Sequence, residues 1–383
     1  MSSLRTGGGP LVRAFAAGVV VAAVTALLAG CATDTTDAAT SSPRPATRTP
    51  SPTPTPTPLT PSEALLAAHA DVPGACAVSF DIEGVALDPQ LQVQDRLYDH
   101  LPIPRMAGRV FAGWYADAAT AASASADPAG HAGSPATRVN GSRPVACTAH
   151  QQKLFGAWTT PDAVAAAKAR VPILMYHQFT AKAEGEQGWL RGNYSYIEDY
   201  RAQMQYIKDQ SFYLPTWDEL SAFIDGALYL PDHAVIITDD DADPSWLTMA
   251  SPINEQLQLM ATSFVITGSG VPAQNRFILQ RSHTHDMHHA GANGKGQMVN
   301  LTAPEIAADM TASATALGGV KEVMAYPYGH NNETSHEGLR QAGFEMARTI
   351  EQGYVSVGSD KLTLPCVRIN YGMGVNALKK QIG

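Results

Sequence analysis

The residues of this chain that could carry out chemistry are a run of aspartates and a group of histidines. Asp240 and Asp241 follow the apolar run 234–238, and four histidines lie within residues 283–289. One carboxylate and two imidazoles can hold a borderline cation such as zinc, and an adjacent carboxylate can then take a proton from the attacking water. The pattern predicts a metal-dependent hydrolytic centre.

Two simpler interpretations stay open for these residues. Neighbouring residues at a strand end point in different directions, so Asp240 and Asp241 can have different tasks, but aspartates are also good turn formers. Histidine makes up 12 of 383 residues, so four within residues 283–289 is a strong enrichment. A polar loop with solvated imidazoles would have the same composition. Asp286 could accept a hydrogen bond from one of the imidazole N–H groups.

The elements that must position these residues alternate between strands and helices from residue 168 onward. Apolar runs predict strands at 171–176, 234–238, 261–266, 277–280, 323–326 and 344–349. Capping boxes at Thr216 with Glu219 and at Thr302 with Glu305 begin two of the helices between them. This alternation predicts an α/β fold, an incomplete (β/α) barrel of six or seven strands. Active sites of such barrels lie at the carboxyl ends of the strands, where the aspartates and histidines fall.

The N-terminus predicts export and lipid attachment. Basic residues precede an apolar stretch at 11–28, and the residues Leu-Ala-Gly before Cys31 resemble a bacterial lipobox. Residues 1–31 are therefore expected to be a lipoprotein signal peptide, with Cys31 lipidated. An ordinary signal peptide with a chance cysteine is the alternative. The Thr/Pro-rich residues 32–62 predict a disordered linker. We expect a lipoprotein on the extracellular face of the cell membrane, anchored by lipid without a spanning helix.

Residues 74–160 differ in character and predict a small β-rich module. The segments 111–115 (FAGWY) and 154–158 (LFGAW) combine aromatics with glycine. This pattern resembles the Listeria–Bacteroides (internalin B-type) repeat, which implies a spacer or adhesion module. Alternatively, Trp114 and Trp158 form a platform that stacks on sugars. Cys76 and Cys147 flank this segment and could form a disulfide, whereas Cys366 lies in an apolar run and is expected to be buried.

Charge narrows the choice of partner. The net charge is -9 and no stripe of lysine and arginine with interleaved aromatics is present, which argues against nucleic acid. A neutral or cationic substrate fits this balance better.

Four segments, taken together, resemble the polysaccharide deacetylase family (NodB homology domain, carbohydrate esterase family 4). They are 171–179 (VPILMYHQF), 238–241 (TDDD), 282–288 (SHTHDMH) and 325–329 (AYPYG), within residues 168–383. The resemblance implies that Asp240 is the general base and that Asp241, His283 and His288 bind the metal. It also implies that the backbone N–H of Tyr328 polarises the acetyl carbonyl.

The chain departs from the family pattern at several positions. It has TDDDA in place of TFDDG, and its metal-binding histidines are five rather than four residues apart, so His285 or His289 could substitute. The arginine usually found before Pro-Tyr is missing. No late Leu-x-x-His motif supplies the general acid, and His330 is the nearest candidate. His177 is expected to be structural or to line the cleft.

The resemblance implies a metal-dependent hydrolase that removes acetyl groups from N-acetylhexosamine units of a cell-envelope or extracellular polysaccharide. The expected metal is zinc, with cobalt or nickel as alternatives, and we expect a monomer. Two other functions stay open. One is a non-catalytic, carbohydrate-binding or adhesion lipoprotein with a degenerate site, and the other is an O-acetyl esterase.

Overall fold

The computed structural model describes residues 58–130 and 137–383. The predicted signal peptide, Cys31 and nearly all of the predicted linker lie outside these residues. The first helix, α1 (Pro61–Ala68), begins within the last residues of that linker and has a capping box at Thr60 and Glu63. In the part of the chain that the structure describes, no helix combines the length and the apolar character needed to cross a membrane.

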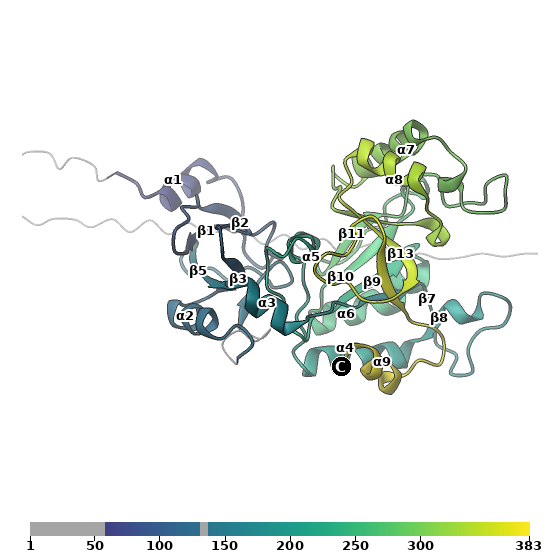
Figure 1. Ribbon diagram of the computed structural model, residues 1–383, viewed down its shortest axis with the longest axis horizontal. Coiled ribbons are helices and arrows are strands. Elements are labelled where there is room, and N and C mark those ends of the chain that lie inside the picture. Colours follow the sequence, from purple (N-terminus) through teal and green to yellow (C-terminus); the bar gives the residue numbers. More distant parts are fainter. Residues whose placement is uncertain (1–57, 131–136) are drawn as a thin grey trace, which may run out of the picture. The chain divides into compact units, whose positions relative to one another are not determined.

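Seven parallel strands form a closed ring (Figure 1). The ring is closed because β10 pairs with both β9 and β11. It has one strand fewer than a complete (β/α)₈ barrel, and it confirms the α/β class. In spatial order the strands are β10 (Ala261–Val265), β11 (Ile278–Ser282), β12 (Val323–Ala325), β13 (Met346–Gln352), β14 (Leu364–Arg368), β6 (Ile173–Tyr176) and β9 (Ile236–Asp240).

The strands are apolar on both faces because both faces are covered. Ile173 and Met175 of β6 belong to the cluster inside the ring, whereas Leu174 and Tyr176 pack outward. Helices α4 (Ile197–Asp209), α6 (Ser251–Leu257) and α9 (Val375–Ile382) cover one side, and α7 (Ala303–Ala316) and α8 (Glu333–Ala342) cover another (Figure 1). Helix α5 (Trp217–Ile224) begins with the predicted capping box. Continuous apolar runs are what such two-sided burial requires.

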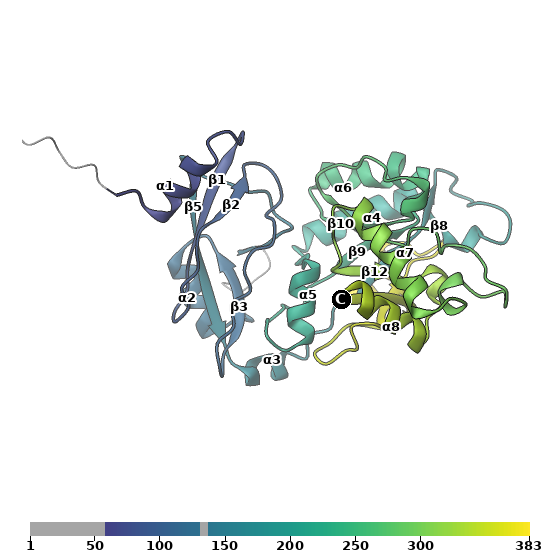
Figure 2. The ribbon, with the colours of Figure 1, turned by 90° about the horizontal axis from the view of Figure 1, so that it is seen from above.

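A five-stranded mixed sheet precedes the ring (Figure 2). Its order is β2 (Gln90–Val93), β1 (Ala75–Asp81), β5 (Gln151–Thr159), β3 (Val110–Tyr115) and β4 (Arg138–Val139). Two short helices, α2 (Ala118–Ala126) and α3 (Pro161–Ala167), accompany these strands. A disulfide joins Cys76 to Cys147 with their Cα atoms 6.2 Å apart, and Cys366 is free and buried as expected.

The tryptophans of this sheet are structural. Trp114 and Trp158 are 2% and 3% exposed, and their indole N–H groups donate to the carbonyls of Pro102 (2.8 Å) and Glu83 (3.0 Å). The alternative of a sugar-stacking platform is therefore wrong, because no ring face is accessible. The resemblance of this segment to the internalin-type repeat stays a prediction.

The sheet and the ring share a core and backbone hydrogen bonds. Phe111 N–H donates to Ala227 O (3.0 Å), and Tyr229 N–H donates to Phe111 O (2.8 Å). Phe111 and Trp114 lie in the same apolar cluster as Trp217 of α5. These contacts make the sheet a packed part of residues 57–383, which form one compact unit.

Candidate active site

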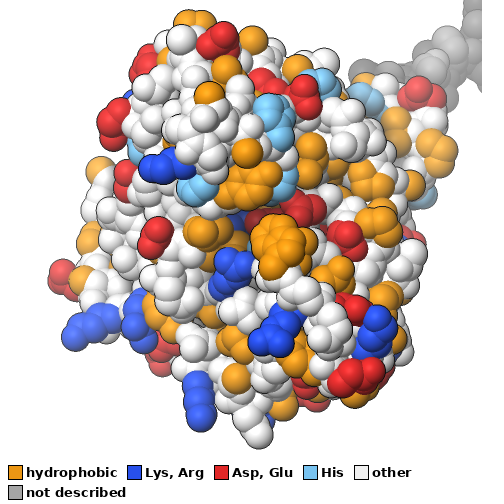
Figure 3. Space-filling model, turned by 90° about the vertical axis from the view of Figure 1, so that its right-hand side faces the viewer, with side chains coloured by type: hydrophobic (Ala, Val, Ile, Leu, Met, Phe, Trp, Pro, Cys, Tyr) orange, Lys and Arg blue, Asp and Glu red, His pale blue; other side chains and the backbone are white. Residues whose placement is uncertain are grey.

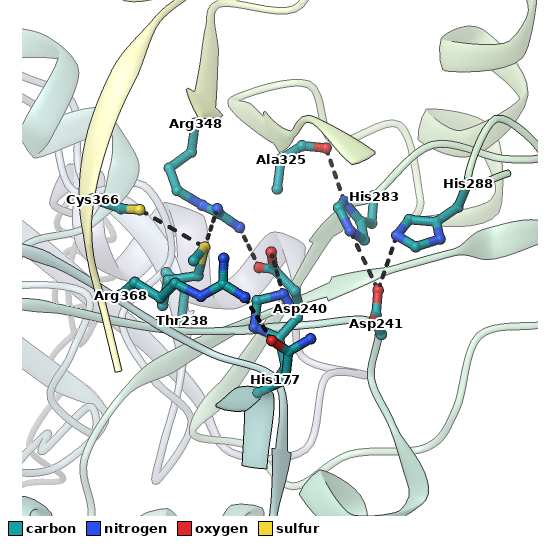
Figure 4. Close-up of polar contacts among 12 residues, drawn as sticks. His177, Thr238, Asp240, Asp241, His283, His288, Ala325, Arg348, Cys366 and Arg368 are labelled. Carbon is teal, nitrogen blue, oxygen red and sulfur yellow. Dashed lines mark hydrogen bonds and ion pairs between the residues drawn. The ribbon is translucent and has the colours of Figure 1, made fainter. Parts of the chain in front are cut away.

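The two aspartates diverge where β9 ends. Asp240 is the last residue of β9, and Asp241 and Ala242 follow with φ of +77° and +50°. This left-handed turn separates the two carboxylates. Figure 4 shows Asp240 directed toward Arg348 and His177, and Asp241 directed toward His283 and His288.

Asp241, His283 and His288 converge on one point. Asp241 Oδ1 lies 3.4 Å from His283 Nε2 and 3.2 Å from His288 Nε2 (Figure 4). His283 Nδ1 donates to Ala325 O (2.9 Å), so in the neutral imidazole Nε2 is the nitrogen free to bind a cation. Within the described residues Asp241 Oδ1 is buried and has no hydrogen-bond partner. One carboxylate oxygen and two imidazole nitrogens facing one point are a donor set that fits a divalent cation.

The protonation states of these groups reflect their mutual contacts. Burial by itself raises the pKa of Asp241, but the closeness of His283 and the charges of His283 and His288 bring the pKa well below its ordinary value. Burial lowers the pKa of His288, and the neighbouring His283 lowers it further. Asp241 is therefore ionised at neutral pH and His288 tends to be neutral, which are the forms that bind a metal.

The segment between the two histidines is an irregular loop. Thr284 has a φ of +73°, and its hydroxyl accepts from Met287 N–H (3.2 Å), so it braces the backbone of the loop. His285 is directed away, with its Nδ1 3.0 Å from Thr267 Oγ1, and His289 is exposed. The structure thus brings together the two histidines that are five residues apart and leaves the two alternatives outside. Asp286 is exposed, and no hydrogen bond of its carboxylate to an imidazole is found among the described residues.

Asp240 is held by a buried arginine that the sequence did not reveal. Arg348, on β13, is fully buried and pairs with Asp240 Oδ1. Burial alone raises the pKa of Asp240, but the charges of Arg348, His177 and His283 outweigh it and lower the pKa. Asp240 is therefore an ionised carboxylate at neutral pH, able to accept a proton. The available signal was a charged residue inside the apolar run 344–349, where it must be buried and needs a partner.

His177 lies beside the same carboxylate. Its Nε2 is 3.7 Å from Asp240 Oδ2, and its Nδ1 is buried without a hydrogen-bond partner among the described residues. Burial lowers the pKa of His177, against the opposing charges of Asp240 and Asp241. The sequence predicted only a structural or cleft-lining role for His177, whereas the structure places it beside Asp240, the candidate base.

Asp239 occupies the position where the family pattern has phenylalanine. Its side chain is fully buried. Burial first, and then the charges of Asp240 and Asp241, raise its pKa well above the ordinary value. This shift favours the neutral carboxylic acid form of Asp239.

Tyr328 lies beside His288, and His330 lies next to Tyr328. Tyr328 has a φ of +59°, its ring centroid is 4.8 Å from that of His288, and its hydroxyl donates to His288 O (3.2 Å). His330 Nδ1 accepts a hydrogen bond from Gly296 N–H (2.8 Å), and no contact of His330 with either aspartate is found within the described residues. Figure 3 shows histidine and carboxylate side chains around a hollow, with large hydrophobic groups at its edge.

The part of the chain that carries this site is similar to known proteins. Residues 229–347 match the family model described as polysaccharide deacetylase. This match contains Asp240, Asp241, His283 and His288 and does not include the five-stranded sheet.

Curated relatives are similar to a little under half of this chain. A poly-beta-1,6-N-acetyl-D-glucosamine N-deacetylase of Staphylococcus aureus (strain MRSA252) is 25% identical over 202 residues, which cover 45% of this chain and 69% of the relative. The protein of the same name from Staphylococcus epidermidis is 22% identical over 200 residues, covering 46% and 69%.

Two solved structures also match part of this chain. The deacetylase PplD of Streptococcus pyogenes, in complex with acetate, is 21% identical with a TM-score of 0.48, covering 56% of this chain and 99% of that chain. The IcaB structure from Ammonifex degensii is 19% identical with a TM-score of 0.46, covering 56% and 97%.

Proposed function

We propose that this protein is a metal-dependent hydrolase that removes acetyl groups from N-acetylhexosamine units of an extracellular or cell-envelope polysaccharide. The observation that carries the proposal is the convergence of Asp241, His283 and His288 beside the ionised Asp240, within a polysaccharide deacetylase domain. The curated relatives are named for poly-beta-1,6-N-acetyl-D-glucosamine, so that polymer is the first substrate to test.

Asp241, His283 and His288 would hold the cation, with zinc the expected metal and cobalt or nickel as alternatives. A cation there supplies Lewis acidity, which makes water more acidic and draws charge from the acetyl carbonyl. Asp240 takes the proton of the attacking water, and Arg348 keeps this carboxylate ionised and oriented. The backbone N–H of Tyr328 donates to the carbonyl oxygen as negative charge develops on it.

The leaving nitrogen needs a proton, and two histidines compete for that role. The sequence pointed to His330, whose Nδ1 is already engaged by Gly296 N–H. The geometry favours His177, because its Nε2 lies 3.7 Å from Asp240 Oδ2, so the proton that Asp240 takes from water can pass to the imidazole. His177→Gln is therefore expected to lower kcat more than His330→Gln.

Two other functions follow from weaker features. Loss of the pattern's phenylalanine at Asp239 would suit a non-catalytic binding protein, and an ester substrate would need less help from a general acid.

The protein's place in the cell is also a proposal. Lipid-anchored attachment through Cys31 to the extracellular face of the membrane predicts a mature N-terminus at Cys31 carrying acyl chains, which mass spectrometry of the membrane fraction would detect.

The decisive experiment measures acetate release by protein that has been stripped with a chelator and then reloaded with zinc or cobalt. The substrates are poly-β-1,6-N-acetylglucosamine oligomers, chitooligosaccharides and peptidoglycan, with an O-acetylated polymer in parallel. Metal-dependent release that Asp241→Ala abolishes supports the proposal. Release from the ester alone would favour the esterase, and bound metal without release from any polymer would favour the binding protein.

A further inference from the structure

The loop that carries His283 and His288 has backbone groups that no helix or strand satisfies. After β11 ends at Ser282, residues 283–289 form bends without helical hydrogen bonds. The N–H groups of His285 and Asp286 therefore need acceptors from elsewhere.

A single carboxylate on α7 accepts both of these hydrogen bonds. His285 N–H donates to Asp309 Oδ1 (2.7 Å), and Asp286 N–H donates to Asp309 Oδ2 (2.8 Å). We infer that Asp309 is a positioning residue that fixes the loop between His283 and His288 and thereby sets the affinity of the site for its metal. This inference rests on the proposed function, because it assumes that the two histidines bind a cation.

Helix α7 supports the loop at a second point, one turn further along. Ser313 Oγ lies 2.7 Å from Ser282 Oγ, and Ser282 Oγ accepts from Thr284 N–H (3.1 Å). Residues four apart on a helix lie on the same face, so Asp309 and Ser313 present their polar atoms to the loop together. Ile306 and Met310 are fully buried beneath the helix, which keeps this face in place.

The charge of Asp309 matters as well as its shape. A carboxylate offers an acceptor oxygen to each N–H, and hydrogen bonds to a charged acceptor are stronger than those between neutral groups. An asparagine could accept only one of the two, because its amide nitrogen would face the other N–H. Without Asp309 the loop keeps the hydrogen bonds of Thr284 to Ser282 and Met287 but loses its attachment to α7 at His285 and Asp286, so the two imidazoles lose their common focus on Asp241.

The test compares zinc dissociation constants, measured by competition with a chromophoric chelator, for the wild type, Asp309→Ala, Asp309→Asn and Glu305→Ala. Glu305 belongs to the capping box of the same helix, where its carboxylate accepts from Thr302, so it controls for general weakening of α7. We expect Asp309→Ala to bind zinc about 10–100-fold more weakly, Asp309→Asn to fall between, and Glu305→Ala to match the wild type. Equal affinity of Asp309→Ala and wild type would overturn the inference, and so would equal losses in Asp309→Ala and Glu305→Ala.

A second measurement needs no metal. Amide hydrogen exchange at His285 and Asp286 in the metal-free protein should be faster in Asp309→Ala than in the wild type, and unchanged in Glu305→Ala. Unchanged exchange in Asp309→Ala would show that Asp309 does not hold the loop. If wild-type protein bound no zinc at all, the proposed function would fail, while the exchange measurement would still decide whether Asp309 holds the loop.

Discussion

Two carboxylates, Glu219 and Asp241, are surrounded by protein in opposite ways. Glu219, where the five-stranded sheet meets the ring, accepts from Asn140 Nδ2 (2.8 Å) and Thr216 N–H (2.9 Å) through one oxygen and from Tyr213 through the other. Asp241 faces two imidazole nitrogens, and its buried oxygen lacks a hydrogen-bond partner among the described residues. A carboxylate with its hydrogen bonds complete holds structure together, whereas one that is left incomplete beside ligand atoms is available to a cation.

The two buried arginines extend this difference. Arg348 in the ring pairs with Asp240, a charge that takes part in the proposed reaction. Arg138 in the sheet donates to Tyr229 O (2.9 Å) and lies over the ring of Tyr213, with 4.6 Å from its central carbon to the ring centroid. Arg348 thus contacts a group that takes part in the proposed reaction, whereas Arg138 contacts a backbone carbonyl and an aromatic ring. The sheet is therefore bound to the ring by contacts of the kind found inside a single fold.

The largest effect is expected from removing the base without disturbing the cation. Asp240→Asn keeps the size of the side chain but cannot accept the proton of water, so kcat should fall by about 10²–10⁴-fold while zinc affinity stays near that of the wild type. Steady-state kinetics with a zinc titration measures both. Asp232→Asn, an exposed aspartate just before β9, is the matched control. Full activity in Asp240→Asn would rule out the assignment of the base.

The next effect concerns the charge pair that holds the base. Arg348→Met leaves Asp240 buried and unpaired, which should lower the free energy of unfolding by about 3–5 kcal/mol and reduce kcat as well. Denaturant unfolding measures the loss. The double variant Asp240→Asn with Arg348→Met should be more stable than Arg348→Met alone, because the unpaired charge is gone. Additive losses in the double variant would mean that the two residues do not act as a pair.

A smaller effect is expected at the contact between sheet and ring. Asn140→Ala removes the donor to Glu219 and to Leu214 O (2.8 Å) and leaves buried acceptors unsatisfied, at a cost of about 1–3 kcal/mol. The ring and the sheet should still unfold in one transition, with zinc affinity unchanged. Two separate transitions, with the second insensitive to Asn140→Ala, would instead show a spacer that folds independently of the ring.

The sequence was informative where function depends on neighbouring residues. Asp240 and Asp241 end one apolar run, and His283 and His288 follow another, so the topology of parallel strands alone brings them to one edge. The same reasoning gave the α/β class and the capping box at Thr216, because strand period and caps are local signals.

The missed residues depend on contacts between distant segments. Arg348 meets Asp240 across 108 positions, and Asp309 meets His285 across 24, and neither spacing has a pattern that periodicity can detect. The burial of Trp114 likewise depends on the sheet packing against α5. Pairings of this kind are set by tertiary packing, which a single sequence does not display.

The smallest effect expected is a pH-dependent link between the sheet and the ring. His100, in the loop after β2, lies 2.6 Å from Asp218 of α5. This hydrogen bond, outweighing partial burial and aided by the charges of Asp218, Asp99 and Glu322, raises the pKa of His100 to about 9. A histidine whose pKa is higher in the folded than in the unfolded state adds stability that is complete below about pH 6.5 and is lost as the pH rises through about 9. Because the His100 side chain is 60% exposed, solvent screening keeps the contribution below about 1 kcal/mol.

Comparing urea midpoints of the wild type and His100→Gln at about pH 6 and about pH 10 isolates the contribution of the His100–Asp218 ion pair. The variant should be less stable at the lower pH and equal to the wild type at the higher one, and an equal difference at both would show that the ion pair contributes nothing.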